Sequence, residues 1–186
     1  VSTIQLDILA NDSDPDGPDD IDTSTFSIVS QPSNAVARII DRDNGIIEFE
    51  PTLHFAGTDS ITYSLCDRTT PAPSCTTQTV EFEVTNEDPI PSADSGSGAK
   101  NISTTSAQVI TDVLVNDSDP DGLADIDVST LSIATDPTNG VIVGINNSEI
   151  TYEPNDYFAG TDTYEYEICD KTVPTRACVT AVSYTH

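Results

Sequence analysis

The chain contains an internal repeat, and this feature limits its possible folds more than any other. The segment Asn11–Gly17, Asn-Asp-Ser-Asp-Pro-Asp-Gly, recurs at 116–122, an offset of 116 − 11 = 105 residues. Further along, Phe55–Asp59 recurs as Phe158–Asp162, an offset of 103. Two residues are therefore lost in between, and we place the loss in a hairpin loop. A repeat of about a hundred residues has the size of a small domain, so the sequence predicts two copies of one domain.

Apolar residues in both copies alternate with polar residues in short runs, the period-two pattern of half-buried strands. Ile4, Leu6 and Ile8 begin the first copy in this way. Asp, Asn, Pro and Gly, which favour turns, separate the runs. The first copy has six such runs, and the second has room for a seventh within residues 91–103. About seven short strands per copy predict an all-β chain of two tandem Ig-like Greek-key β-sandwich domains.

We place the two domains at residues 1–88 and 89–186. The first copy lacks a counterpart of the residues just after Asp88, so its opening strand is absent from this sequence. Either the chain was cut there, or the strand comes from another molecule, as in filaments that assemble by strand donation. In both cases we expect the first domain to be incomplete alone, because it lacks this strand. The edge that the strand would cover is then unpaired, and an unpaired strand edge invites association. The chain begins with Val and has no Met, so we expect a processed or excised piece of a longer protein.

The charge balance excludes several functions. The chain has 32 Asp and Glu residues against 6 Lys and Arg, a formal net charge of −26. Nucleic acids and anionic membrane surfaces bind clustered cations, and here the cations are scattered singly. No run of 18 apolar residues exists, so we expect no membrane insertion in this segment. We also expect no enzyme, because the repeats carry no recognisable catalytic motif, and His54 has Tyr157 as its counterpart.

The four cysteines form two pairs of equal spacing. Cys66 and Cys75 flank a Pro-containing loop between two predicted neighbouring strands, and Cys169 and Cys178 repeat the arrangement. Antiparallel neighbours bring such residues to disulfide distance. A zinc site would need closer spacing and further ligands. The pattern therefore favours two disulfides, and disulfides indicate an oxidising compartment, here extracellular or at the cell surface.

An acidic loop in each copy predicts a calcium site. Alternate carboxylates in Asp-x-Asp-x-Asp-Gly converge on one point, and like charges so close repel one another unless a cation neutralises them. All-oxygen ligands with flexible geometry suit Ca²⁺. The alternative is a plain turn in which Asp side chains cap backbone N–H groups. The candidate ligands are Asp12, Asp14, Asp16, Asp20 and Asp22 in the first copy and Asp117, Asp119, Asp121, Asp125 and Asp127 in the second.

The segment that joins the copies is a second candidate cation site. Glu87, Asp88 and Asp94 could bind an ion between the domains and fix their angle. The alternative is a solvated joint that Pro89 and Pro91 stiffen without any ion.

These motifs together give the chain its family resemblance. It is similar to the bacterial Ig-like or cadherin-like tandem repeats of large secreted surface adhesins. The resemblance implies a secreted, calcium-associated stalk, with two Phe residues in the core and two Asp residues that hold the adjoining turns. It rests on Asp7–Gly17, Phe55–Tyr63, Cys66-Asp67, Asp112–Asp117, Phe158–Asp162 and the joint residues Asn86, Asp88 and Pro89; the implied core residues are Phe55 and Phe158, and the turn residues are Asp59 and Asp162.

The expected function is that of a structural repeat module in a secreted or surface-anchored bacterial protein. We expect it to serve as a calcium-stiffened stalk in adhesion or in an extracellular matrix. The alternative is a subunit of an extracellular filament that assembles by β-strand donation between neighbours. The expected partners are neighbouring repeats of the same chain or identical subunits, with a cell-surface or matrix ligand as a further candidate.

Overall fold

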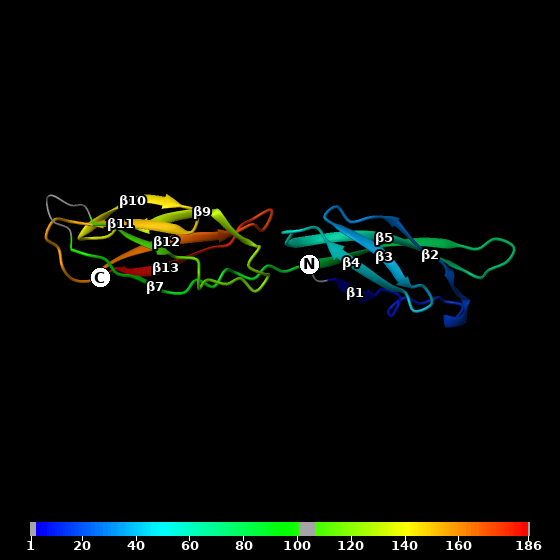
Figure 1. The fold of residues 1–186 in the computed structure, drawn as a ribbon. Helices are drawn as coiled ribbons and strands as arrows, with labels where there is room; N and C mark the ends of the chain where they lie inside the picture. The colour runs from blue at the N-terminus through cyan, green and yellow to red at the C-terminus, as the bar shows by residue number, and fades with distance from the viewer. Residues whose placement is uncertain (1–2, 101–106, 186) are drawn as a thin grey trace. The chain divides into compact units, whose positions relative to one another are not determined.

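A computed structural model describes residues 3–100 and 107–185 (Figure 1). The chain divides into two compact units, Val1–Thr85 and Asn86–His186. In both units short strands form two facing sheets, and the helical structure among the described residues is one 3-10 turn at Pro18–Asp20. The predicted all-β fold class is therefore confirmed. None of the described residues belongs to a helix with the length and apolar character needed to cross a membrane.

Unit 1 is a sandwich of two three-stranded sheets with strand orders β1-β4-β3 and β2-β5-β6. Side chains alternate between core and solvent along β1, β3 and β4, as the sequence pattern predicts, whereas the first five residues of β6 are all exposed. Phe26, Ile47, Phe49 and Ile61 are fully buried at its centre. The strands are β1 (Ile4–Asp7), β2 (Ile21–Ser30), β3 (Ala35–Asp41), β4 (Ile46–Pro51), β5 (Gly57–Asp67) and β6 (Cys75–Val84).

Unit 2 repeats this arrangement with one more strand, in the sheet orders β10-β11-β8 and β7-β13-β12-β9. Its core contains two fully buried tyrosines, Tyr164 and Tyr166, where unit 1 has Ile61 and Tyr63. The strands are β7 (Asp94–Gly96), β8 (Val109–Asp112), β9 (Ile126–Thr135), β10 (Gly140–Asn146), β11 (Glu149–Pro154), β12 (Asp162–Asp170) and β13 (Cys178–Thr185).

The additional strand, β7, lies within the range 91–103 that the sequence predicts for a seventh strand, although residues 101–103 of that range lie outside the described residues. It runs parallel to β13, with Asp94 paired to Ser183 and Gly96 paired to Thr185 (Figure 1). The corresponding edge in unit 1 belongs to β6, which pairs only with β5 within residues 3–100 and 107–185. The two units thus differ at one sheet edge.

The two-residue difference between the repeats lies in a hairpin, as predicted. Residues 42–45 connect β3 to β4, whereas only residues 147 and 148 connect β10 to β11. Both loops need a left-handed residue to reverse the chain tightly, and Gly45 (φ 68°) and Asn147 (φ 53°) supply it. The shorter loop changes no strand pairing, so the sandwich tolerates the loss.

Asp162 ties a turn of unit 2 to its core strands. Its carboxylate accepts hydrogen bonds from the backbone N–H groups of Thr138 (3.2 Å), Asn139 (2.7 Å) and Thr163 (3.0 Å) and from the hydroxyl of Tyr152 (3.0 Å). Burial raises the pKa of Asp162, but the hydrogen bonds from these N–H groups outweigh it, so the pKa lies below its ordinary value.

The turn role that the resemblance implies for these aspartates is therefore present in both units. Asp59 accepts the backbone N–H groups of Ser33 (3.1 Å) and Asn34 (2.6 Å) in unit 1. The core role implied for Phe55 and Phe158 is wrong. Both rings are only half-buried, because each lies over the glycine two residues further on rather than between the sheets.

We predict that Asp162→Asn lowers the free energy of unfolding of unit 2 by about 2 kcal/mol at pH 7, since an amide cannot replace a charged acceptor of several N–H groups. The pKa of Asp162 is depressed in the folded protein. Its contribution to the free energy of unfolding is therefore fully present above the pKa of the unfolded protein, near 4, and is lost as the pH falls through the lower pKa of the folded protein. Urea unfolding at pH 7 and pH 3 measures this. The exposed Asp136 provides the control, Asp136→Asn, and an equal loss in both variants would contradict the prediction.

Candidate cation sites at the acidic loops

In unit 1 the acidic loop and the end of a strand bring three carboxylates together. One oxygen each of Asp14, Asp20 and Asp67 lies within 4.8 Å of the others. Asp14 belongs to a tight turn in which its Oδ1 accepts the N–H of Asp16 (2.8 Å) and its carbonyl accepts the N–H of Gly17 (3.0 Å). Gly17 has φ 123°, which only glycine adopts without strain, so this glycine lets the loop turn back toward β5.

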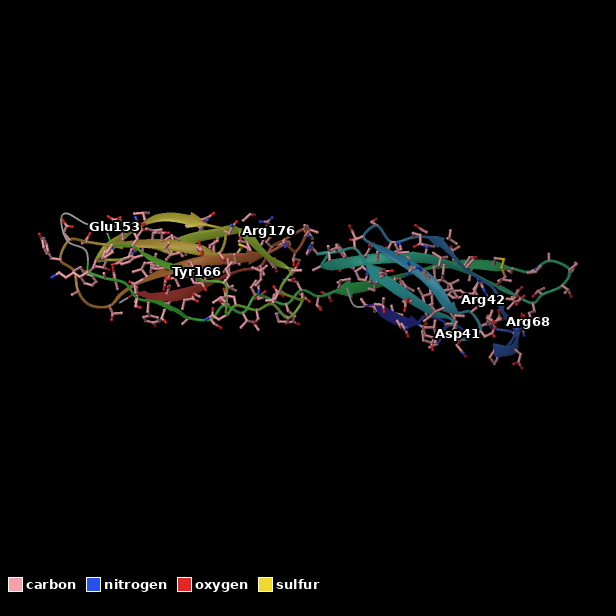
Figure 2. The ribbon with its side chains drawn as sticks, viewed as in Figure 1. Asp41, Arg42, Arg68, Glu153, Tyr166 and Arg176 are labelled. Carbon is pink, nitrogen blue, oxygen red and sulfur yellow. A yellow bond between two sulfur atoms is a disulfide. The ribbon has the colours of Figure 1, made fainter. Side chains whose placement is uncertain are left out.

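The electrostatics of this first cluster favour a counter-charge. Burial raises the pKa of Asp20, and the neighbouring charges of Asp14, Asp67 and Asp16 raise it further. The neighbouring Arg68, labelled in Figure 2, donates from its side chain to the carbonyl of Asp19 and from its backbone N–H to the carbonyl of Asp20, and this N–H partly offsets the rise in the pKa of Asp20. The carboxylates at this end of unit 1 therefore lie close to one another, and the guanidinium of Arg68 donates a hydrogen bond to a backbone carbonyl.

In unit 2 the corresponding loop is more deeply buried. One oxygen each of Asp119, Asp121 and Asp125 lies within 4.8 Å of the others, and Asp119 and Asp125 are each only 6% exposed. Burial raises the pKa of Asp119, and the charges of Asp125, Asp121 and Asp170 add to the shift. The Oδ2 atom of Asp119 is buried and has no hydrogen-bond partner among the described residues. A buried carboxylate oxygen without a partner is costly, so this atom favours a cation site at the cluster.

Residues upstream of β7 close this second cluster. Asn86 donates from Nδ2 to Oδ2 of Asp170 (2.7 Å) and accepts from the hydroxyl of Thr172. The backbone N–H of Glu87 donates to Oδ2 of Asp121 (2.8 Å). Asp170 is fully buried. The cluster therefore draws on three stretches of the chain within unit 2: the acidic loop, the end of β12 and the segment that precedes β7.

Sequence reasoning missed Asp67, a member of the first cluster, and Asp170, whose charge lies near the second. The signal was present, because the Cys-Asp dipeptide recurs in both copies, at Cys66-Asp67 and Cys169-Asp170. Each Asp follows its cysteine at the end of a strand that pairs with the strand after the acidic loop. Only the strand pairing shows that the end of β5 or β12 reaches the loop.

The structure places other predicted ligands away from the clusters. Asp12 accepts the hydroxyl of Tyr63 (2.8 Å). Asp117 accepts the backbone N–H of Ser92 (2.8 Å) and lies 3.2 Å from the hydroxyl of the buried Tyr166, labelled in Figure 2, which also lies 2.8 Å from the carbonyl of Val113. These two carboxylates hold the loop onto the core strands. Asp16 lies next to the first cluster in sequence but is not among its three convergent carboxylates.

Asp22 and Asp127 serve local turns instead. The Oδ1 atom of Asp22 accepts both the N–H (3.1 Å) and the hydroxyl (2.6 Å) of Ser24, and Asp127 repeats this with Ser129. Asp127 also pairs with Arg176 at 2.9 Å. Hydrogen bonds from the serine lower the pKa of each of the two carboxyl groups.

The candidate ligands of the joining segment are not convergent. Glu87 meets the acidic loop of unit 2 through its backbone, and the side chain of Asp88 is exposed. Asp94 is buried in β7, 6% exposed, beside Asp117 and Tyr166. None of the three belongs to a cluster of metal-binding side chains among the described residues.

The residues of both acidic clusters fit a calcium ion. All donors are oxygen atoms, which a hard cation such as Ca²⁺ prefers. Calcium–oxygen distances of about 2.3–2.6 Å place ligands on opposite sides of one ion about 5 Å apart, so oxygens within 4.8 Å of one another can share an ion. In unit 2 the unpartnered Oδ2 of Asp119 would become a ligand. Asp14, Asp20 and Asp67 would hold the ion of unit 1, and Asp119, Asp121 and Asp125 that of unit 2.

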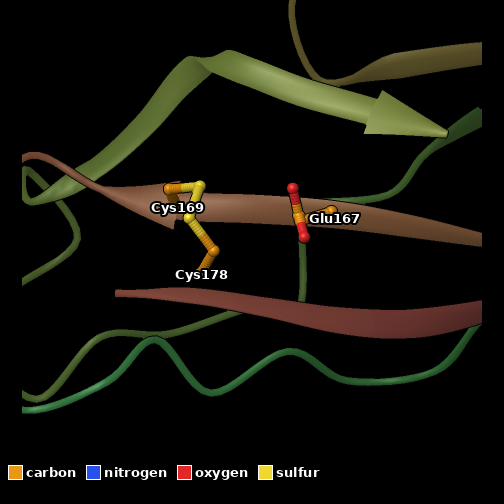
Figure 3. A group of neighbouring side chains, drawn as sticks. All are labelled: Glu167, Cys169 and Cys178. Atoms are coloured by element: carbon orange, nitrogen blue, oxygen red, sulfur yellow. A yellow bond between two sulfur atoms is a disulfide. The ribbon is translucent and has the colours of Figure 1, made fainter. Parts of the chain in front are cut away.

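The cysteines form the disulfides Cys66–Cys75 and Cys169–Cys178. Each bond joins directly paired residues of two antiparallel strands. Glu167 lies near the second bond on the same strand, β12 (Figure 3). Because metal binding by cysteine requires a free thiolate, the sulfur atoms of this group offer no zinc site.

The comparisons with known proteins identify a family. The model of a bacterial Ig domain matches residues 1–83 and again residues 86–182. No curated protein matches the chain.

Three solved structures illustrate more distant likenesses. The endo-fucoidan hydrolase MfFcnA9 of glycoside hydrolase family 107 is 13% identical over 98% of this chain and 30% of its own, with a TM-score of 0.35. Human protocadherin-24 EC1-2 is 13% identical over 94% and 85% of the two chains, with a TM-score of 0.33. The zebrafish RET cadherin-like domains 1 to 4 are 8% identical over 88% and 41%, with a TM-score of 0.24. The chain spans 23–30% of the length of the hydrolase chains that it matches.

The buried Asp94 leads to a prediction about pH. Burial raises the pKa of Asp94 to about 6, and the charges of Asp117 and Asp112 contribute. A carboxyl group whose pKa is higher in the folded than in the unfolded protein binds its proton more tightly in the folded state, so protonation stabilises the fold and deprotonation destabilises it. The stability of unit 2 should therefore fall as the pH rises from about 4 through about 6, by up to about 3 kcal/mol.

Thermal unfolding in chelator between pH 4 and pH 8 measures this change. Asp94→Asn should flatten the profile and raise the stability at pH 7. The exposed Asp88 provides the control, since Asp88→Asn should leave the profile as it is. A profile that Asp94→Asn does not change would contradict the assignment.

Proposed function

The chain belongs to the bacterial Ig domain family, and we propose that it is a structural repeat of a secreted or surface-anchored bacterial protein, stiffened by Ca²⁺ at the acidic end of each unit. The two units carry the same disulfide, the same tied turn and the same acidic loop, which suits a module whose task is to hold its shape. Non-catalytic modules of this kind extend a surface protein in adhesion or in an extracellular matrix, with neighbouring repeats and a surface or matrix ligand as partners.

The observation that carries this proposal is the buried carboxylate of Asp119. Its Oδ2 atom has no hydrogen-bond partner among the described residues, and its nearest charges are other carboxylates. Its Oδ1 atom accepts the N–H of Asp121 (2.8 Å), but a buried charge beside other carboxylates is still expensive, whereas a bound divalent cation would turn the repulsion into shared coordination. The site is thus better explained by a cation than by a plain Asp-Pro-Gly turn.

Calcium would add a link between elements that backbone hydrogen bonds already connect, from Arg68 to Asp20 in unit 1 and from Lys171 to Asp125 in unit 2, 2.8 Å each. In unit 1 the ion would link the acidic loop to the end of β5, and in unit 2 it would hold the loop at the start of β9. An ion that binds only the folded state stabilises it by RT ln(1 + [Ca²⁺]/Kd). Extracellular calcium modules commonly have Kd values of about 10⁻⁴–10⁻³ M, so the proposal concerns a protein outside the cell, where the disulfides also persist.

Calcium titration tests the proposal. We predict that millimolar Ca²⁺ raises the melting temperature of unit 2 by a few degrees, since a Ca²⁺ concentration of about 1–10 times Kd adds about 0.4–1.4 kcal/mol. Asp119→Asn with Asp121→Asn should abolish this response. The matched control is Asp127→Asn. It removes a nearby carboxylate that contacts Ser129 and Arg176 and does not belong to the cluster.

The control should lower the melting temperature slightly and keep the calcium response. A wild-type melting curve that is the same in Ca²⁺ and in chelator would contradict the calcium assignment, as would a response that survives in the double variant.

A second candidate function is a filament subunit that assembles by strand donation. The observation in its favour is the outer edge of β6, which has no neighbouring strand among residues 3–100 and 107–185. We predict that a filament-forming chain shows concentration-dependent assembly in light scattering and regular fibres in electron micrographs. A chain that sediments as a monomer across the accessible concentrations would contradict this second function and leave the first intact.

A further inference from the structure

Buried polar side chains form a row across one sheet of unit 2. Asp94 of β7 pairs with Ser183 of β13, and Ser183 pairs with Tyr164 of β12, so the three residues lie side by side on neighbouring strands (Figure 1). Directly paired residues project to the same face of a sheet. All three are at most 6% exposed, so this face is the one that the core covers.

Thr111 of β8 adds a fourth side chain from the opposite sheet. Its Oγ1 atom lies close to the backbone of β7, since a Cβ atom on Gly96 would come within 2.4 Å of it. The hydroxyl groups of Thr111 and Ser183 also lie near that of Tyr164. Burial raises the pKa of Tyr164 and the charge of Asp94 adds to the rise, whereas these two hydroxyl groups act to lower it. Polar groups from four strands thus converge between the sheets.

These four residues, which we call the polar row, each have an oxygen atom without a hydrogen-bond partner within residues 3–100 and 107–185. Each residue is between 0% and 7% exposed, so water at the surface does not serve these atoms. In the described part of the chain, the one other buried side-chain atom of this kind is Oδ2 of Asp119. The atoms of the polar row are Oδ2 of Asp94, Oγ1 of Thr111, the hydroxyl oxygen of Tyr164 and Oγ of Ser183.

Unit 1 shows that the sandwich does not need hydroxyl groups at these positions. The polar row of unit 2 therefore requires its own explanation, because buried polar atoms without partners lower stability. At the repeat offsets of 105 and 103, the three hydroxyl-bearing residues have apolar counterparts: Leu6 for Thr111, Ile61 for Tyr164 and Val80 for Ser183.

The chemistry of the polar row fits a water molecule better than a divalent metal ion. A water molecule donates two hydrogen bonds and accepts two, so one molecule can satisfy four oxygen atoms. It can donate to the carboxylate of Asp94 and to one hydroxyl oxygen, and accept from the other two hydroxyl groups. Ca²⁺ takes about six to eight oxygen ligands and Mg²⁺ requires an octahedral set, whereas the polar row offers four oxygen atoms and a single carboxylate.

From these contacts we propose that the polar row of unit 2 binds one ordered water molecule between the two sheets. The water bridges Thr111 of β8 to the three strands of the facing sheet, through hydrogen bonds that the side chains do not make with one another. It also ties β7, a strand of three residues, to the core through Asp94. The four residues are separate from the acidic clusters, so the proposal does not depend on calcium binding.

An atomic-resolution crystal structure of the full chain, grown in rubidium chloride, tests the proposal directly. We expect one water molecule at about 2.5–3.0 Å from the oxygen atoms of the polar row, and no anomalous signal of rubidium at that position. Rubidium there would identify a monovalent-cation site and overturn the proposal. Side-chain oxygens that bond directly to one another, with no water between them, would overturn it as well.

Oxygen-17 magnetic relaxation dispersion, which counts long-lived internal water molecules, tests the site in solution. Thr111→Val combined with Ser183→Ala keeps both side chains near their original size and removes two of the four partners. We expect the count to fall by about one relative to the unchanged chain. Thr185→Val serves as the comparison, because it removes a buried hydroxyl of the same strand that donates to the carbonyl of Asp162 (3.3 Å), and its count should stay the same.

An unchanged count in the folded double variant, or an equal loss in Thr185→Val, would contradict the proposal. The crystal structure uses the unchanged chain, so it decides the question even if the double variant does not fold.

Discussion

Repulsion between carboxylates is the constraint on which the rest of this structure depends. The chain carries a net charge of −26, and each unit gathers three carboxylates within 4.8 Å at one end of its sandwich. Buried like charges are tolerated only when something compensates them. Within each unit the same acidic loop leads into the strand that pairs with the disulfide-bearing strand. A cation that holds the loop would therefore also order one end of the sandwich, so mechanical stiffness and cation binding would have one physical origin.

The two units show how one sequence motif can lie in different surroundings. Asp119 of unit 2 is buried, and Asn86 and Glu87 close its cluster from the segment before β7. The counterpart, Asp14, is only half-buried. A more buried site offers stronger electrostatic attraction to a cation and larger repulsion without one. The same upstream segment also supplies β7, so in unit 2 the covering of the sheet edge and the closing of the acidic loop depend on one stretch of chain.

Sequence alone predicted the parts of the fold that follow from local pattern. The repeat and the period-two alternation located the strands, and the two-residue change of offset located the shortened hairpin. The candidate site was predicted only in part, because Asp67 and Asp170 reach the loop through strand pairing rather than sequence proximity. Asp22 and Asp127 looked like ligands from their spacing, but the serine two residues later satisfies each of them locally. The half-buried Phe55 shows that a motif residue can cover a turn instead of entering the core.

The most direct test of the cation hypothesis is a crystal structure of the chain grown in millimolar Ca²⁺, with anomalous scattering used to locate the ions. The predicted result is one calcium ion in each acidic cluster, at about 2.3–2.6 Å from carboxylate oxygens that include Oδ2 of Asp119. Acidic clusters without anomalous density, in which Oδ2 of Asp119 binds water or a proton instead, would contradict the hypothesis.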